Sequence, residues 1–288
     1  MTVAIVTDSA ASLPDDLAGE LGILRVPMQI EIAGFPYSED EIELEELVAK
    51  LDDGVLTSGP APGAFLEAIE RAQPTGRGEG DGVVVLTVGQ HFSSTYLSAV
   101  AAASARGSLD GVRVVDTGTA AGAQGLVVLE AALEARRGAR IDEVVSRANH
   151  VMENVHLVAA VGELRYLTRG GRLPGAAARA AEHLGLHVLF ELRGKGVHPM
   201  MPALSGDGAI GQIVSHWRKT RVEGAALHVA ALHAMRPESA EALLGAVKSE
   251  TVPETSFVGR FGPVMVAHTG PGVVGLAWWW DVPRAPVH

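Results

Sequence analysis

Polar side chains follow three short apolar runs of this sequence. Carboxylate and hydroxyl groups come after such runs at Asp8-Ser9, Ser93-Ser94-Thr95 and Asp116-Thr117. Each run is typical of a buried parallel strand. The carboxyl ends of parallel strands lie along one edge of a sheet, where ligands bind in open α/β folds. The pattern therefore predicts a polar binding site at that edge.

Ser93, Ser94 and Thr95 also precede a predicted helix that ends near Arg106. Free backbone N–H groups and the helix dipole favour an anion at such a point. The alternative is that Ser93 or Ser94 only caps the helix, which is the commoner use of serine there. Three consecutive hydroxyls after a turn that contains Gly89 add weight to an anion site.

Two further segments have the chemistry to bind an anion. Thr57 and Ser58 begin a hydroxyl-bearing turn before a predicted helix at Pro62, although they could equally cap that helix. Arg169 and Arg172 flank two glycines, and guanidinium groups match the geometry of a carboxylate or phosphate. A helix that ends at this turn, with basic residues near its negative end, explains the arginines as well.

His268 and Thr269 open a glycine-containing segment after an apolar run, 264–268, that we interpret as a strand. His268 could donate a hydrogen bond to an anion, although a single histidine at a strand end is more often structural. Residues 270–275 match the letters G-x-G-x-x-G. A dinucleotide site is excluded, because the 13 residues after Gly275 (288 minus 275) cannot form the required crossover and acid.

A serine hydrolase is the enzymatic alternative. Ser93 or Ser94 would be the nucleophile, His268 the base, and Asp8 or Asp116 the group that orients it. The G-x-S-x-G nucleophile elbow is absent, since Thr95 stands where its second glycine would be. We therefore predict no catalytic residue and keep the hydrolase as an alternative.

Composition excludes several classes of protein. The net charge of −11 and the absence of a basic run argue against a nucleic-acid binder. The absence of cysteine excludes disulfides and thiolate sites. The apolar runs are shorter than the ~18 residues of a membrane helix, and the N-terminus does not resemble a signal peptide. We expect a cytoplasmic protein with no stable membrane insertion.

The histidine pairs do not predict a metal site. His183 and His187 are separated by Gly185, which suggests a helix end between them. His228 and His233 are an odd number of residues apart, so a continuous strand would point them to opposite faces. We predict neither a metal nor a cofactor.

The order of predicted elements indicates an α/β fold with two domains. Strand, polar turn and helix alternate through residues 1–153, which predicts a parallel sheet. Residues 154–288 contain a run of strand candidates, which predicts a mixed sheet. The predicted strands are Val3–Thr7, Ile23–Ile32, Val83–Thr87, Val112–Asp116, His156–Val161, Leu186–Leu192, Ala225–Ala231, Thr255–Phe261, Val264–His268 and Val273–Trp280.

Taken in order, these segments resemble the DegV family, whose studied members include fatty-acid-binding proteins. The resemblance covers nearly the whole chain, and its motifs are short but specific in their order and spacing. They are Val6-Thr7-Asp8-Ser9, Thr57-Ser58-Gly59-Pro60, Ser93-Ser94-Thr95-Tyr96-Leu97-Ser98-Ala99, Val115-Asp116-Thr117, Leu164–Arg172 and His268-Thr269-Gly270-Pro271-Gly272.

The resemblance implies one long-chain fatty acid between two α/β domains. The family's carboxylate-binding hydroxyls correspond to Thr57 and Ser93, with His268 and the basic Arg172 close by. The resemblance also implies a role, because the studied fatty-acid-binding members of the family are not enzymes. They present the fatty acid to a separate kinase. Ser58, Ser94, Thr95 and Thr269 belong to the same motifs and complete the predicted site.

The resemblance also leaves alternatives open. The acyl chain requires apolar walls, for which Phe92, Leu186, Phe190 and Met200 are candidates, although each could be ordinary core. Ser94 stands where the family usually has glycine. The stretch 199–208 lacks the basic residue often found near the family's kinase-facing edge. The same site could also carry another amphipathic acid.

Overall fold

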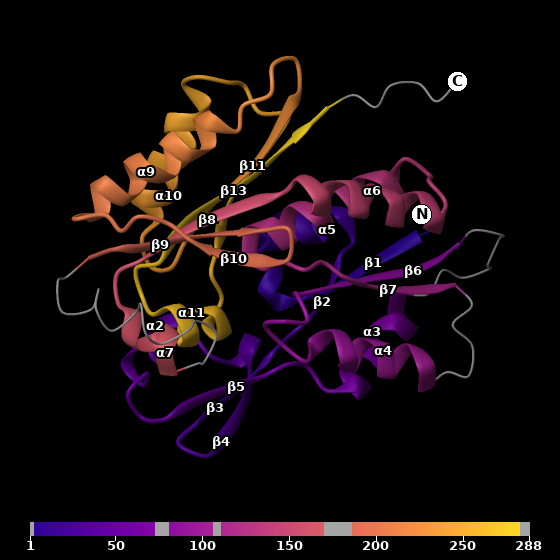
Figure 1. Ribbon diagram of the computed structural model, residues 1–288. Coiled ribbons are helices and arrows are strands. Elements are labelled where there is room, and N and C mark those ends of the chain that lie inside the picture. The colour runs from indigo at the N-terminus through magenta and orange to yellow at the C-terminus, as the bar shows by residue number, and fades with distance from the viewer. Residues whose placement is uncertain (1–2, 73–80, 106–110, 170–185, 283–288) are drawn as a thin grey trace.

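The computed structural model describes residues 3–72, 81–105, 111–169 and 186–282 (Figure 1). Its strands form two larger sheets and one small sheet. The predicted α/β fold, with a parallel sheet formed early in the chain and a mixed sheet formed late, is confirmed. Arg172 lies outside the described residues.

The first sheet has the order β2-β1-β6-β7 and is parallel throughout. Val85 in its centre pairs with Val6 on one side and Val114 on the other. All four carboxyl ends therefore point the same way, as the sequence predicted. The strands are β1 (Val3–Asp8), β2 (Leu24–Val26), β6 (Gly82–Thr87) and β7 (Val112–Asp116).

Helices cover both faces of this sheet (Figure 1). Phe65, Ile69 and Ala99 pack against Val83 and Val85 on one face. The helices on that face are α3 (Pro62–Ala72) and α4 (Thr95–Ala105). The other face is covered by α1 (Asp15–Leu21), α5 (Ala121–Arg136) and α6 (Ile141–Asn154).

The second sheet has six strands in the order β10-β9-β8-β13-β11-β12. Neighbouring strands are antiparallel except β11 and β12, which are parallel. The strands are β8 (His156–Val161), β9 (Val188–Arg193), β10 (Gly196–Pro199), β11 (Ala226–His233), β12 (Thr255–Arg260) and β13 (Val274–Asp281). Its outer face is covered by α9 (Gly206–Lys219) and α10 (Pro237–Lys248).

A small antiparallel sheet, β4-β3-β5, lies beside the larger ones. Its strands are β3 (Gln29–Ile32), β4 (Phe35–Ser38) and β5 (Val55–Ser58). The same part of the chain also forms the helix α2 (Leu44–Ala49) and the short 3-10 helices η1 (Ser9–Ala11) and η2 (Glu39–Glu41). The extended segment predicted over 23–32 consists of two strands, β2 and β3. Pro27 interrupts it because proline has no N–H for a ladder, so β2 and β3 join different sheets.

The predicted strand Val264–His268 is wrong. This segment is the helix α11 (Pro263–Thr269), which lies near α7 (Leu164–Arg169) and α2. A short apolar run does not distinguish a strand from a buried helix turn. Pro263 at the first helical position favours the helix. His268 therefore stands in the last turn of a helix.

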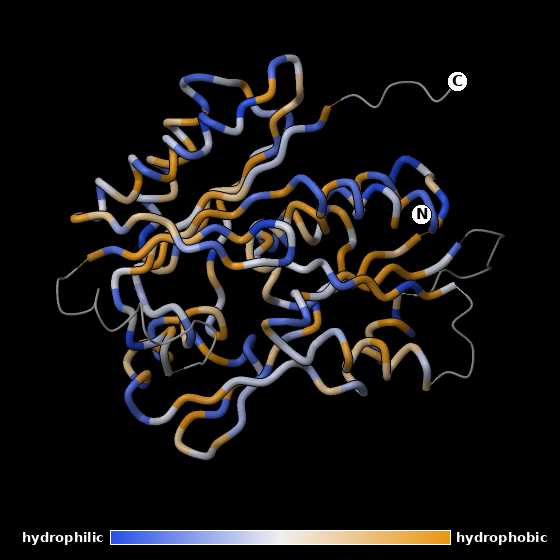
Figure 2. The backbone as a smooth tube through the Cα atoms, in the orientation of Figure 1, coloured by the Kyte–Doolittle hydropathy of each residue, from blue (hydrophilic) through white to orange (hydrophobic). Residues whose placement is uncertain are grey.

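The main core extends between the two larger sheets. Helix α5 packs between them, and most of its residues are buried. Figure 2 shows hydrophobic residues concentrated in the strands of both sheets and hydrophilic residues on the outer helices and turns. The predicted domain boundary near Glu153 falls at the end of α6, and it stays a prediction.

The carboxyl group of Asp8 holds three segments together at the carboxyl end of β1. Its two oxygens accept hydrogen bonds from the backbone N–H of Val88 at 2.7 Å and of Ala10 at 3.1 Å. The side chain of Gln124 in α5 donates a third, also at 3.1 Å. Complete burial raises the pKa of Asp8 from 3.8 to about 6, although these hydrogen bonds lower it.

We predict that Asp8 makes stability depend on pH. Because its folded-state pKa is raised, the folded protein binds more protons than the unfolded chain between pH 3.8 and about 6. The stability that protonation contributes is complete below this window and is lost as pH rises through it. Relative to Asp8→Asn, the wild type should lose on the order of 3 kcal/mol of unfolding free energy between about pH 4 and pH 7.

Urea unfolding of both proteins across this range measures the effect. Both proteins contain the same other titratable groups, and the asparagine does not titrate. The difference between their unfolding free energies therefore reports the titration of Asp8. A difference in unfolding free energy that stays constant with pH would contradict the prediction.

Candidate functional site

A cavity of about 250 Å³ lies where β1, β5 and β6 end near α11 and β9. Six of the predicted site residues line it: Thr57, Ser58, Ser93, Ser94, His268 and Thr269. They come from both halves of the chain, so only the tertiary fold brings them together. Whether they contact a ligand stays a prediction.

Thr57 and His268 meet directly across the cavity wall. The Oγ1 of Thr57, in β5, lies 2.7 Å from the Nε2 of His268, in α11. Both side chains are half-buried. This hydrogen bond joins the two halves of the chain at the polar part of the cavity.

The Ser93 hydroxyl is held by the start of α4. The Oγ of Ser93 lies 2.8 Å from the Oγ1 of Thr95 and accepts a hydrogen bond from the backbone N–H of Thr95 at 3.3 Å. Thr95 is fully buried and does not line the cavity itself. Thr95 therefore fixes the position of the Ser93 hydroxyl without lining the cavity. Ser94 lies exposed at the start of the helix.

Gly59 allows the two hydroxyl turns to approach each other. A Cβ atom at this position would lie 2.5 Å from the Oγ1 of Thr95 and 3.2 Å from its Cα. Only glycine has the space for this contact. The sequence predicted a turn at 57–60, but Thr57 and Ser58 are the last residues of β5, and residues 59–61 connect this strand to α3.

The remainder of the cavity is mostly apolar. Of the predicted wall residues, Phe92 and Phe190 line it. Met200 instead packs with the outer core, and Leu186 is not among the lining residues. Sequence reasoning missed Ala10, Met28, Val88, Gly59, Ala120, Leu167, Leu192, Val197, Val264 and Met265. In the strand predicted over 186–192, Phe190 and Leu192 share one face. This alternation was the signal that could have identified Leu192 as a lining residue.

Glu39 anchors the helix that carries His268. Its Oε1 accepts a hydrogen bond from the backbone N–H of Val264 at 2.9 Å, in the first turn of α11. Its Oε2 accepts one from the hydroxyl of Ser9. Burial raises the pKa of Glu39, although these hydrogen bonds lower it. Glu39 could not be predicted from the sequence, because its partner Val264 lies far along the chain.

The geometry does not assemble the triad that the hydrolase alternative requires. Asp8 accepts hydrogen bonds from backbone groups and Gln124, and Asp116 accepts from the backbone N–H groups of Gln90 and Gly118. The Nε2 of His268 contacts Thr57 instead of either serine.

Of the histidines considered for metal binding, His228 and His233 have separate partners. His228 contacts Thr255 and Glu130, whereas His233 accepts from the backbone N–H of Arg236. His183 lies outside the described residues.

The chain matches the model of an uncharacterised protein family, DegV, over residues 2–280. It belongs to the DegV family. A DegV domain-containing protein of Streptomyces coelicolor is 34% identical over 279 residues, which cover 95% of this chain and 97% of that protein. The resemblance stated from the motifs is therefore confirmed.

Solved DegV structures share the whole fold. A DegV family protein from Thermus thermophilus, described as fatty acid binding, matches with a TM-score of 0.84 and 29% identity over 97% of this chain and 100% of that chain. DegV from Bacillus subtilis, described as a fatty acid binding protein, matches with a TM-score of 0.81 and 25% identity. That match covers 98% of this chain and 100% of the Bacillus chain. Within the described residues, no helix has the length and apolar character to span a membrane.

We predict that loss of the Glu39 carboxyl loosens α11. Glu39→Ala leaves the N–H of Val264 and the hydroxyl of Ser9 without their acceptor, which should cost roughly 1–3 kcal/mol of unfolding free energy. Glu39→Gln keeps an oxygen that can accept from Val264, so it should lose less. Urea unfolding measures both variants, and an alanine variant as stable as the wild type would contradict the anchor.

Proposed function

We propose that this DegV protein is a carrier that binds one long-chain fatty acid in the cavity. The observation that carries the proposal is a single cavity with hydroxyl groups and a histidine in one part and apolar side chains in the rest. Such a division matches a carboxylate joined to a hydrocarbon chain. The fatty-acid-binding descriptions of two solved relatives support the same ligand.

Ser93 is suited to donate to the carboxylate. When the hydroxyl of Thr95 donates to the Oγ of Ser93, the Ser93 proton is available to a ligand. The backbone N–H of Thr95 points at the same oxygen and reinforces this orientation. Ser94 and the start of α4 add polar groups beside it, where an anion is favoured.

Thr57 can act in the same way from the opposite segment. With its proton on Nε2, His268 donates to the Oγ1 of Thr57. The Thr57 hydroxyl is then available to donate to the carboxylate. Ser58 and Thr269 line the same cavity, and by family resemblance Arg172 supplies the basic group near the ligand head.

The apolar lining accounts for the acyl chain. Phe92 and Phe190 lie with Met28, Leu167 and Leu192 around the cavity. Each methylene transferred from water to such a surface contributes about 0.8 kcal/mol. The tail can therefore provide most of the affinity, while the hydroxyls orient the head.

The proposed role is binding and delivery without catalysis or a cofactor. We propose a cytoplasmic carrier that presents its ligand to a separate fatty-acid kinase, as the family resemblance implies. The hydrolase alternative would need His268 to leave Thr57 and approach Ser93 or Ser94. Neither Asp8 nor Asp116 is placed to orient it.

Native mass spectrometry of the purified protein tests the ligand class directly. We expect a bound mass that denaturation releases as a long-chain fatty acid, and a rise in melting temperature with palmitate or oleate. A protein that holds no fatty acid and shows no shift would overturn the proposal. Binding of a different amphipathic acid that outcompetes palmitate would favour the alternative carrier. Labelling of Ser93 or Ser94 by a fluorophosphonate would favour the hydrolase.

We predict that Ser93→Ala and Thr57→Val each weaken fatty-acid binding by roughly tenfold or more, because a hydrogen bond to a charged group contributes about 1.5–3 kcal/mol. Ser104→Ala is the matched control, since its exposed hydroxyl donates to the carbonyl of Val100 within α4 and is not among the residues that line the cavity. Displacement of a fluorescent fatty acid gives all three affinities. Equal affinities for the control and the two site variants would contradict the assignment.

Delivery to a kinase needs its own test. The loaded protein is incubated with ATP and the fatty-acid kinase of the same cell, and acyl-phosphate is trapped as the hydroxamate. We expect product only when both proteins are present. Tight fatty-acid binding without product would retain the carrier and remove the kinase partnership.

A further inference from the structure

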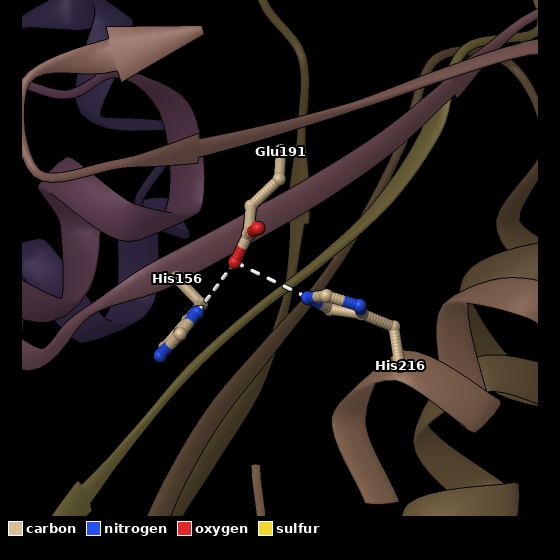
Figure 3. Close-up of side chains that lie close together, drawn as sticks. All are labelled: His156, Glu191 and His216. Carbon is tan, nitrogen blue, oxygen red and sulfur yellow. Dashed lines mark hydrogen bonds and ion pairs between the residues drawn. The ribbon is translucent and has the colours of Figure 1, made fainter. Parts of the chain in front are cut away.

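A second polar cluster lies on the face of the six-stranded sheet that is turned away from the cavity. Phe190 and Leu192 of β9 line the cavity, whereas Glu191 between them faces the opposite way, as strand alternation requires. His156 enters this cluster from β8 and His216 from α9. Figure 3 shows both imidazole rings pointing at the Glu191 carboxylate.

The three side chains converge on a single oxygen atom. The Oε1 of Glu191 lies 2.6 Å from the Nδ1 of His156 and 3.2 Å from the Nε2 of His216. One ligand atom from each residue falls within 4.8 Å of the others. Ligands of one tetrahedral zinc ion lie roughly 3.3 Å apart, because Zn–N and Zn–O bonds are about 2.0–2.2 Å long. A small rotation of Glu191 therefore makes room for an ion.

A tryptophan holds both rings in place. The ring of His156 stacks on Trp278 with centroids 5.1 Å apart and planes 2° apart, and His216 meets the same indole edge-on at 6.0 Å. The indole N–H of Trp278 donates to the Oγ1 of Thr220 at the end of α9. The rings are thus oriented before any ligand binds, which favours coordination.

The hydrogen bonding of the cluster is incomplete. The Nε2 of His216 is shielded from solvent, and within the described part of the chain it makes no aligned hydrogen bond, although it lies 3.2 Å from Glu191. When the proton of His216 is on Nδ1, the Nε2 lone pair faces the Glu191 carboxylate. A metal cation between them would use both groups, whereas His216 with its proton on Nε2 would instead donate to Glu191.

We propose that His156, Glu191 and His216 bind one divalent transition-metal ion of the zinc type. Two imidazoles and one carboxylate select zinc and its neighbours over calcium or magnesium, which prefer oxygen ligands. Three protein ligands leave a fourth position for water. The side chains of His156 and His216 are 16% and 26% exposed, so an ion can enter from solvent. The bound ion would clamp α9 to β8 and β9.

Zinc titration of the tag-free, chelator-treated full chain tests this site. We expect one zinc ion per chain by isothermal titration calorimetry and a higher melting temperature with zinc. Added Co²⁺ should give tetrahedral absorption bands and quench tryptophan fluorescence, because Trp278 stacks on a ligand. A wild-type protein that takes up no zinc would overturn the proposal.

Two histidine variants locate the ion. His156→Gln and His216→Gln should each weaken zinc binding by about tenfold or more, since even a residue that only supports a ligand contributes that much. His91→Gln is the matched control, because His91 is exposed in the segment after β6 and its ring packs on Phe92, outside this cluster. Zinc affinity that is unchanged in both cluster variants would overturn the assignment.

A footprint on the wild type keeps the test independent of variant folding. Zinc should protect His156 and His216 from diethylpyrocarbonate, as measured by peptide mass spectrometry, while the exposed His91 stays reactive. Equal modification of the cluster histidines with and without zinc would overturn the site. None of these readouts depends on fatty-acid binding, so the two proposals fail separately.

Discussion

Burial of helix α5 between the two larger sheets is the constraint on which the remaining structure depends. Ala123, Leu126 and Val127 are fully buried within this helix, and the same core includes β1 residues on one side and β11 residues on the other. A helix that is apolar on every side must be covered on every side. The two sheets therefore share a core, and Ala120 at the start of α5 lines the cavity. The position of the cavity follows from that packing.

Buried carboxyl groups connect this core to the site. Asp8 and Glu39 each accept hydrogen bonds from segments distant in sequence, and burial raises the pKa of both. Glu130 in α5 lies between His228 and Arg147. Burial opposes its charge, but these hydrogen bonds and charges outweigh burial, so the pKa of Glu130 is lowered. A buried carboxyl requires such partners, and each one therefore specifies how its neighbouring segments pack.

The polar part of the cavity is not strongly charged. Among the residues that the structure describes, its lining contains hydroxyls and one histidine but no lysine or arginine. Hydroxyls supported from behind, as Ser93 is by Thr95, can orient a carboxylate without the large desolvation cost of a buried cation. Such a site suits a ligand that must be held and later released.

The sequence by itself determined the parallel strands β1, β6 and β7, the helices after them, and the hydroxyl groups at their ends. These features depend on local periodicity and on the rule that parallel strands end at one edge. The tertiary structure decided that His268 stands on a helix beside Thr57, that Glu39 anchors that helix, and that His156, Glu191 and His216 converge. These contacts join residues far apart in the chain. Their partners depend on how elements pack, which local sequence patterns do not specify.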